Sequence, residues 1–306
     1  MRSLPILNRP KHQVWQPLPA SPTDRQMVLI HELRRAVGSL PPIASLNPAL
    51  VEQEWIKNES RLRQLLVTED PREFLSWPMV VWTIFVANQA YVGVSLRSLQ
   101  LRGDWKSRWE PALRECWVGS PRPYKWFPES SGNLIHQADL LAQFEECTDK
   151  RIEDVEFIFE FGGGYGSMSR LAHNLGFRGD YVLFDLPAFS LLQQFFLKSI
   201  GVMGPRVHCI SDLEELGRVL QDNGVIAAPL FVAMWSICEV PTEMRERILG
   251  LVSSYDAFLI LYQERFAQTD NIAFFRKWTQ TQEGIDWFGW ELAHQPGVRY
   301  LIGVRD

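Results

Sequence analysis

Cysteine is scarce in this sequence. Four cysteines are widely spaced over 306 residues, and none belongs to a C-x-x-C pair. Cys209 and Cys238 lie within apolar, strand-like runs, where we expect them to be buried thiols. Cysteine usage of this kind is typical of the reducing cytoplasm, which is where we expect the protein.

A dense block of positive charge is absent too, and so is a clear membrane-spanning run. The formal net charge is −5, so we expect no nucleic-acid partner. The first residues, Met1–Ile6, lack the apolar core of a signal peptide. The most apolar stretch, Phe74–Val92, contains Pro78, Asn88 and Gln89, which favours a buried helix over a membrane span. That helix would lie in the core of the N-terminal region or form the interface of a homodimer.

The first 150 residues are predicted to be mostly helical. Apolar residues make up 46% of the chain and charged residues 22%, as in globular proteins with a full core. Prolines crowd the segment before residue 23 and indicate an extended arm. Helical spacing is found at 24–37, 47–66, 74–92 and 104–117. An irregular aromatic loop is expected at 119–132, and another helix begins at Asn133.

From residue 151 onward, strand-like and helix-like segments alternate. Apolar strands are predicted at 155–159, 181–184, 206–210, 229–235 and 257–262. This alternation is the mark of a parallel, doubly wound α/β sheet. Two final runs, 287–293 and 299–304, predict a closing hairpin. We therefore expect a helical domain over 1–150 and an α/β domain over 151–306.

A glycine-rich turn follows the first of these strands. The motif is Glu160-x-Gly162-x-Gly164-x-Gly166, with Gly163 and Tyr165 in two of the intervening positions. A strand that leads into a helix through glycines lets backbone N–H groups approach a ligand closely. The dinucleotide fingerprint G-x-G-x-x-G does not fit, because Ser167 or Ser169 stands where its last glycine should be. This disfavours a nicotinamide oxidoreductase, and a tight turn without a ligand is the alternative.

Polar residues also follow the later strands, at the edge where an open α/β sheet binds its ligands. Asp185 is placed to bind both hydroxyls of a ribose, and it could also cap the next helix. Ser211 or Asp212 is placed to meet an adenine amino group, or Ser211 is only a helix cap. Trp235 would stack on a cofactor or lie in the core.

These segments together resemble the sugar O-methyltransferase family. The matching segments are Glu160–Gly166, Tyr181-x-x-x-Asp185-Leu186-Pro187 and Leu230-Phe231-x-x-x-Trp235-Ser236-x-x-Glu239-x-Pro241. Asn133 and His136 match an Asn-x-x-His segment of the helical region. The likeness covers the C-terminal half well and the N-terminal half loosely. Its first motif is that of methyltransferases that use S-adenosylmethionine (SAM).

The resemblance implies a Rossmann-like, seven-stranded SAM-methyltransferase sheet whose glycines pass beneath the amino acid part of SAM. Glu160 would help to hold the ammonium group of SAM. The residues expected at the cofactor are Glu160, Gly162, Gly163, Gly164, Tyr165, Gly166, Asp185, Leu186, Ser211, Asp212, Trp235 and Ser236. The acceptor would be a sugar or a glycosylated metabolite, contacted by Tyr124, Trp126, Asn133 and Glu264.

Methyl transfer to a hydroxyl also needs a base to remove the proton. His136 is the first candidate, because it follows a loop that could cover the cleft, although it could instead bond backbone carbonyls at a helix start. Glu239 is the second candidate, either as the base or as a holder of sugar hydroxyls. In the loop, Arg122 and Lys125 could contact an acidic or nucleotide-linked sugar.

Other functions stay open at this stage. We expect no metal, because no cluster of Asp and Asn stands out that could hold Mg²⁺. The alternatives are methylation of a non-sugar small molecule at nitrogen or oxygen, and a non-catalytic interaction protein with a SAM-binding fold.

Overall fold

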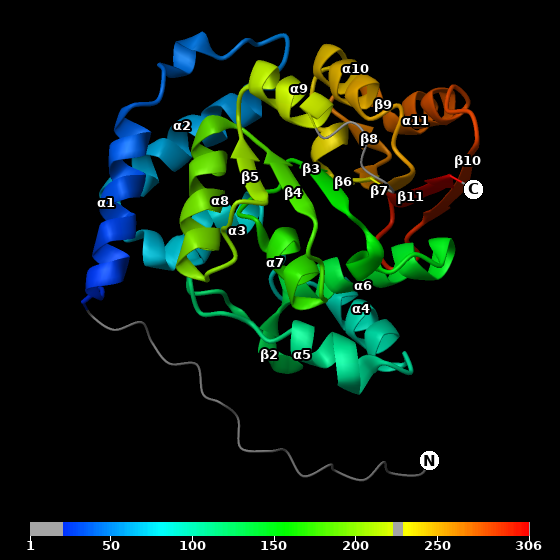
Figure 1. Ribbon diagram of the computed structural model, residues 1–306, viewed down its shortest axis with the longest axis horizontal. Helices are drawn as coiled ribbons and strands as arrows, with labels where there is room; N and C mark the ends of the chain where they lie inside the picture. Colours follow the sequence, from blue (N-terminus) through cyan, green and yellow to red (C-terminus); the bar gives the residue numbers. More distant parts are fainter. Residues whose placement is uncertain (1–20, 223–228, 306) are drawn as a thin grey trace.

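A seven-stranded sheet built by the second half of the chain lies at the centre of the molecule (Figure 1). The computed structural model describes residues 21–222 and 229–305, so most of the predicted proline-rich arm lies outside the described residues. The strand order is β10-β11-β7-β6-β3-β4-β5. The strands are β3 (Phe157–Phe161), β4 (Asp180–Phe184), β5 (Val207–Ile210), β6 (Pro229–Met234), β7 (Ala257–Gln263), β10 (Ile285–Glu291) and β11 (Val298–Arg305).

The direction of the strands identifies the fold. Neighbouring strands pair in parallel from β7 through β5, whereas β11 is antiparallel to both β7 and β10. This is the class I methyltransferase arrangement, with a closing hairpin whose last strand runs against the others. The predicted α/β sheet of seven strands is therefore confirmed.

Side chains of the central strands alternate between two apolar cores. Ile158 and Leu183 face one core, whereas Phe159 and Val182 face the other. Both faces of these strands are buried, which explains their nearly continuous apolar sequences. The helices that contribute to the first core are α1 (Asp24–Gly38), α2 (Gln53–Thr68), α3 (Pro78–Thr83), α4 (Ala90–Gln100), α5 (Glu110–Ala112), α6 (Gly132–Thr148), α7 (Ser167–Asn174) and α8 (Pro187–Ser199). Those on the second are α9 (Leu213–Asp222), α10 (Thr242–Leu251) and α11 (Asn271–Thr279).

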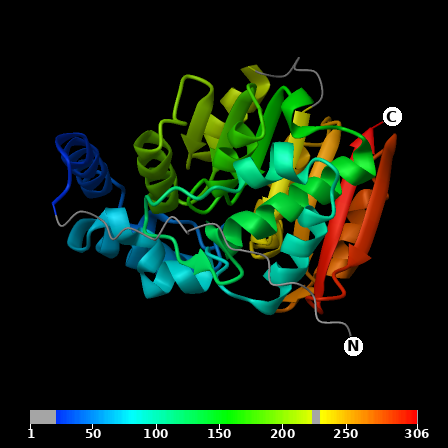
Figure 2. The same ribbon diagram turned by 90° about the horizontal axis from the view of Figure 1, so that it is seen from below.

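The N-terminal helices share their core with the sheet. Helix α6 is buried along most of its length, and it packs against α4, α7 and β11. Helices α1 and α2 lie beside α8, and Figure 2 shows α1 and the hairpin β10–β11 at opposite ends of the molecule. The predicted division at residue 150 stays a prediction. Among the described residues, no helix has the length and apolar character needed to cross a membrane.

The predicted helix at 74–92 is wrong as a single element. The chain forms a short 3-10 segment (Pro71–Ser76) and α3, and then leaves helical geometry from Ile84 to Gln89 before α4 begins. The backbone N–H of Val86 donates instead to the side-chain oxygen of Asn133, at 3.2 Å. The non-helical segment is held against the start of α6, and it becomes part of the wall of the site.

Three other local predictions also need correction. The helix at 47–66 begins only at Gln53, because the Asn47 side chain closes a turn by accepting from the N–H of Ala49. At 104–117, a π-helical turn (Trp105–Trp109) leads into the short α5, and the helix then ends. The loop at 119–132 contains a small hairpin, β1 (Pro123–Tyr124) and β2 (Phe127–Ser131).

Candidate active site

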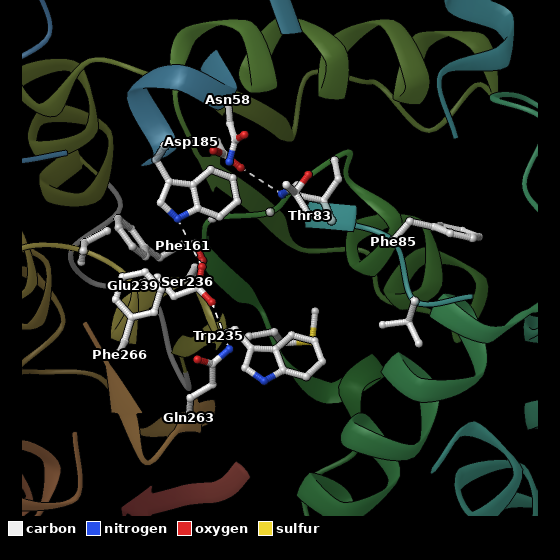
Figure 3. A pocket seen from close by; sticks show the side chains of 18 of the residues that line it. Asn58, Thr83, Phe85, Phe161, Asp185, Trp235, Ser236, Glu239, Gln263 and Phe266 are labelled. Atoms are coloured by element: carbon white, nitrogen blue, oxygen red, sulfur yellow. Dashed lines mark hydrogen bonds between the residues drawn. The ribbon is translucent and has the colours of Figure 1, made fainter. Parts of the chain in front are cut away.

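A cavity of about 980 Å³ opens at the carboxyl ends of the central strands (Figure 3). The chain leaves β3 toward β4 on one side, and β6 lies on the other, so a crevice forms at this edge of the sheet. Residues after β3, β4, β6 and β7 line one part of the cavity. Helix α2 with the residues just before it, segment 81–91, helix α6 and residues 295–298 line most of the rest.

The glycine turn after β3 forms one wall. Gly162 and Gly164 have φ values of +72° and +59°, a conformation that glycine adopts at little cost. A Cβ atom on Gly162 would lie only 2.2 Å from Cβ of Ser236. The hydroxyl of Ser236 donates to the carbonyl of Phe161. The glycine turn and the segment after β6 therefore meet in direct contact because residue 162 has no side chain.

Glu160 lies beneath this turn with only 2% of its surface exposed. The hydroxyl of Tyr181 donates to its Oε2 at 2.8 Å. Burial raises the pKa of the Glu160 carboxyl to about 7, since desolvation outweighs the hydrogen bond from Tyr181. A cationic group bound in the cavity would favour the ionised form of this carboxylate.

Asp185 organises the neighbouring loop. Its Oδ2 accepts from the N–H of Gly164 at 2.9 Å and from Gln193 at 3.2 Å, and its Oδ1 accepts from the N–H of Leu186 at 2.8 Å. Burial raises the pKa of Asp185 to about 8. Since each carboxylate oxygen can accept two hydrogen bonds, Oδ1 retains capacity for a ligand hydroxyl.

Glu239 faces the cavity from the segment after β6 (Figure 3). The indole N–H of Trp55 donates to its Oε2 at 3.2 Å, and the side-chain amide of Gln263 donates to its Oε1 at 3.3 Å. Burial raises the pKa of Glu239 to about 7. Trp55 was missed in the sequence, because it lies on α2, 184 positions before its partner, and nothing near it signals a site.

A buried arginine supports the Glu239 segment from behind. Arg245 on α10 has no exposed surface, and it donates to the carbonyls of Cys238 and Val240 on either side of Glu239. Its guanidinium also donates to Asn271 at 2.9 Å, and Asn271 donates to the backbone carbonyl of Gln263. These contacts fix the backbone that carries Glu239 and its amide partner.

Three aromatic rings form the inner end of the cavity. The rings of His136 and Trp235 stack with centroids 5.5 Å apart, and Tyr91 meets His136 edge-on at 5.1 Å. Trp235 has a φ of +61°, a conformation rare for a bulky residue, and this places it at the abrupt end of β6. His136 is 1% exposed, and neither ring nitrogen has a hydrogen-bond partner among the described residues. Burial, and less so His294, lowers the pKa of His136 to about 3.

Most of the predicted site residues come together in this cavity. Those that line it are Asn133, His136, Glu160, Gly162, Gly163, Gly164, Tyr165, Asp185, Leu186, Trp235, Ser236, Glu239 and Glu264. Within this group, Asn133 is already bonded to Val86, Tyr165 and Ser167. Its role as a sugar contact therefore stays a prediction, whereas its role in linking α6 to the glycine turn is visible.

Five predicted residues are not brought into the cavity. They are Tyr124, Trp126, Gly166, Ser211 and Asp212. Asp212 accepts from the N–H of Glu215 at 2.8 Å, so it has the helix-capping role considered for Ser211. Tyr124 is buried in the small hairpin, and Trp126 is 68% exposed at its turn. Gly166 is the N-cap residue just before α7 and has a φ of +89°.

The described residues include no group of three or more His, Cys, Asp and Glu side chains placed to hold a metal ion. No protein-family model matches the chain, and no curated protein matches it.

Several solved structures share parts of the fold. One is a precorrin-6y C5,15-methyltransferase from Geobacter metallireducens (14% identity, TM-score 0.38, 58% of this chain and 90% of that one). Another is magnesium protoporphyrin IX methyltransferase from Synechocystis with bound SAM (14% identity, TM-score 0.39, 72% of this chain and 100% of that one). A third is an rRNA methylase from Streptococcus thermophilus (13% identity, TM-score 0.36, 55% of this chain and 93% of that one). These likenesses are low, and the strand order of the sheet identifies the fold without them.

Proposed function

We propose that this protein is a SAM-dependent methyltransferase that transfers a methyl group to a hydroxyl of a sugar or a glycosylated metabolite. The observation that carries the proposal is the buried Glu160 carboxylate beside the glycine turn, in one cavity with Asp185 and Glu239. The sugar assignment is supported by the sequence resemblance and by the aromatic rings and amides of the wall. Methylation of another small molecule is the alternative.

The residues of the glycine turn fit the cofactor. Glu160 would hold the ammonium group of SAM, and Asp185 would accept from a ribose hydroxyl through the free capacity of Oδ1. A Cβ on Gly163 would lie 3.3 Å from the Glu160 carboxyl, so a larger residue there would crowd the carboxylate. When bound, SAM supplies the activated methyl group.

The structure favours Glu239 over His136 as the base. A carboxyl with a pKa of about 7 is partly ionised at neutral pH, and it can take a proton from a bound hydroxyl. Imidazole with a pKa of about 3 is a much weaker base. His136 would instead hydrogen-bond the acceptor as a neutral ring, and the stack with Trp235 would exclude water.

The cofactor assignment is tested by calorimetric titration with S-adenosylhomocysteine (SAH), with NAD as the control ligand. We expect binding of SAH alone, and we expect Glu160→Gln to weaken it at least tenfold. Glu156→Gln is the matched control, because this exposed carboxylate lies just before the same strand and does not line the cavity. Wild-type protein that binds neither ligand, or NAD alone, would contradict the proposal.

A further inference from the structure

Carboxylates dominate the charged groups of the cavity wall. Among the described residues that line it, a single arginine, Arg265, is present, and no lysine. The lining carboxylates are Glu52, Glu54, Glu160, Asp185, Glu239 and Glu264. Glu54 pairs with Lys57, and Glu264 pairs with Arg299 at 3.0 Å. Glu52, Glu160, Asp185 and Glu239 form no ion pair with a described residue, so Arg265 is the one cation that the described part of the wall offers to a bound molecule.

The innermost carboxylates are bound by uncharged donors. Glu160 accepts from the phenol of Tyr181, and Glu239 accepts from the indole of Trp55 and the amide of Gln263. Hydrogen bonds from these groups orient the carboxyls, but they bring no positive charge to the wall. An anionic group bound nearby would lose its hydration without gaining a cationic partner, and every ionised carboxyl would also repel it.

Several other polar groups of the wall are uncharged. Two buried ring nitrogens of His136 and the buried Oε1 of Gln295 have no hydrogen-bond partner among the described residues. His136 is neutral in this environment, so its ring offers one N–H donor and one acceptor nitrogen. Hydroxyl groups can donate to and accept from such partners, whereas a phosphate can only accept from them.

The cations predicted near the acceptor lie elsewhere. Arg122 and Lys125 are exposed, and neither lines the cavity. Lys125 lies 5.2 Å from the ring centroid of Trp126, on the turn between β1 and β2. The loop thus supplies no positive charge to the described lining of the cavity, and its contact with an acidic or nucleotide-linked sugar stays a prediction without support from the cavity wall.

We propose that the acceptor is an uncharged or amine-bearing polyol, and that the cavity selects against phosphorylated, nucleotide-linked and carboxylate-bearing molecules. This inference rests on the proposed function and narrows its substrate class. Glu239 would bind and deprotonate a hydroxyl, or hold a neighbouring ammonium group, without competition from an acceptor anion. His136 and Gln295 would take the remaining hydrogen bonds of the polyol.

The test uses the full-length protein, isotope-labelled SAM and a small-molecule extract of the cells from which the protein comes. The extract is separated by anion exchange into a retained, anionic fraction and an unretained fraction. Methylated products are then detected by mass spectrometry, with Glu239→Gln protein as the control for transfer at this site. We expect labelled product in the unretained fraction from wild-type protein.

A second measurement compares the identified acceptor with its own phosphate ester. We expect kcat/KM to be at least about tenfold lower for the ester, which corresponds to about 1.4 kcal/mol. Label mainly in the retained fraction, or an ester that reacts as well as its parent, would overturn the inference and leave methyl transfer established. Protein that binds SAH but labels neither fraction would overturn the proposed function, and the acceptor class with it.

Discussion

At the scale of single residues, Glu239 makes the sharpest prediction about chemistry. Glu239→Gln keeps the size of the side chain but cannot take a proton, so we expect turnover to fall by about 10²–10⁴-fold. The dissociation constant of SAH should change little. Wild-type kcat should rise with pH through about pH 7, where the carboxyl ionises. A Glu239→Gln protein with normal turnover would remove this residue from the role of base.

The same carboxyl also links stability to pH. Its pKa is about 7 in the folded protein and 4.5 as the reference value, so the folded state binds the proton more tightly. The contribution of Glu239 to stability is therefore present below pH 4.5 and lost as pH rises to about 7. We expect wild-type protein to lose more stability than Glu239→Gln between about pH 5 and about pH 8. Thermal melts at both pH values measure the difference, and parallel changes would contradict it.

Gly162 tests whether the close approach of two strand ends shapes the cofactor site. Gly162→Ala brings a Cβ to 2.2 Å from Ser236 in a backbone with a φ of +72°. Gly201→Ala is the matched control, because its φ is +75° and nothing lies within 4 Å of the added atom. The free energy of unfolding should fall by about 1 kcal/mol or more in both variants because of backbone strain, but only Gly162→Ala should weaken SAH binding. Equal SAH affinities for the two variants would contradict this account of the turn.

At the scale of elements, α10 supports the active-site segment through Arg245. Arg245→Met removes the donors to the carbonyls of Cys238 and Val240. We therefore expect the free energy of unfolding to fall by about 1–3 kcal/mol, together with a clear fall in turnover. Arg247→Met is the control on the same helix, since Arg247 is half-exposed and, within the described part of the chain, pairs with Glu243. Arg247→Met should change the free energy of unfolding by no more than about 0.5 kcal/mol. Urea unfolding and turnover measure both, and similar results for the two arginines would argue against a supporting role.

The helices and strands also show where local sequence patterns were sufficient to predict the fold. The order of strands and helices after residue 151 was predictable, because each pattern is local and the strands are buried on both faces. The break between α3 and α4 was not predictable. There, tertiary contacts with Asn133 override a stretch whose own apolar residues favour a helix.

At the scale of the whole molecule, the site depends on contacts between distant parts of the chain. Glu160, Asp185 and the glycine turn could be identified because they belong to one strand–turn–helix unit and the next strand. Trp55 and Arg245 could not, because each acts only through a fold that brings it to Glu239. Ser211 and Asp212 do not line the cavity, since position after a strand does not determine whether a side chain reaches it, and their contact with adenine stays a prediction.

The shared core predicts that the two halves of the chain unfold together. Arg108, before α6, pairs with Glu145 on α6 at 2.6 Å and with Glu153 beyond residue 150. The guanidinium is 10% exposed, so Arg108→Met would leave the buried carboxylate of Glu145 without its cation and would remove the link to Glu153, which keeps only Arg151 among the described residues. We expect one calorimetric transition, shifted as a whole by Arg108→Met and scarcely by Lys106→Met at an exposed pair. Two separate transitions, with only one shifted by Arg108→Met, would instead support independent domains divided near residue 150.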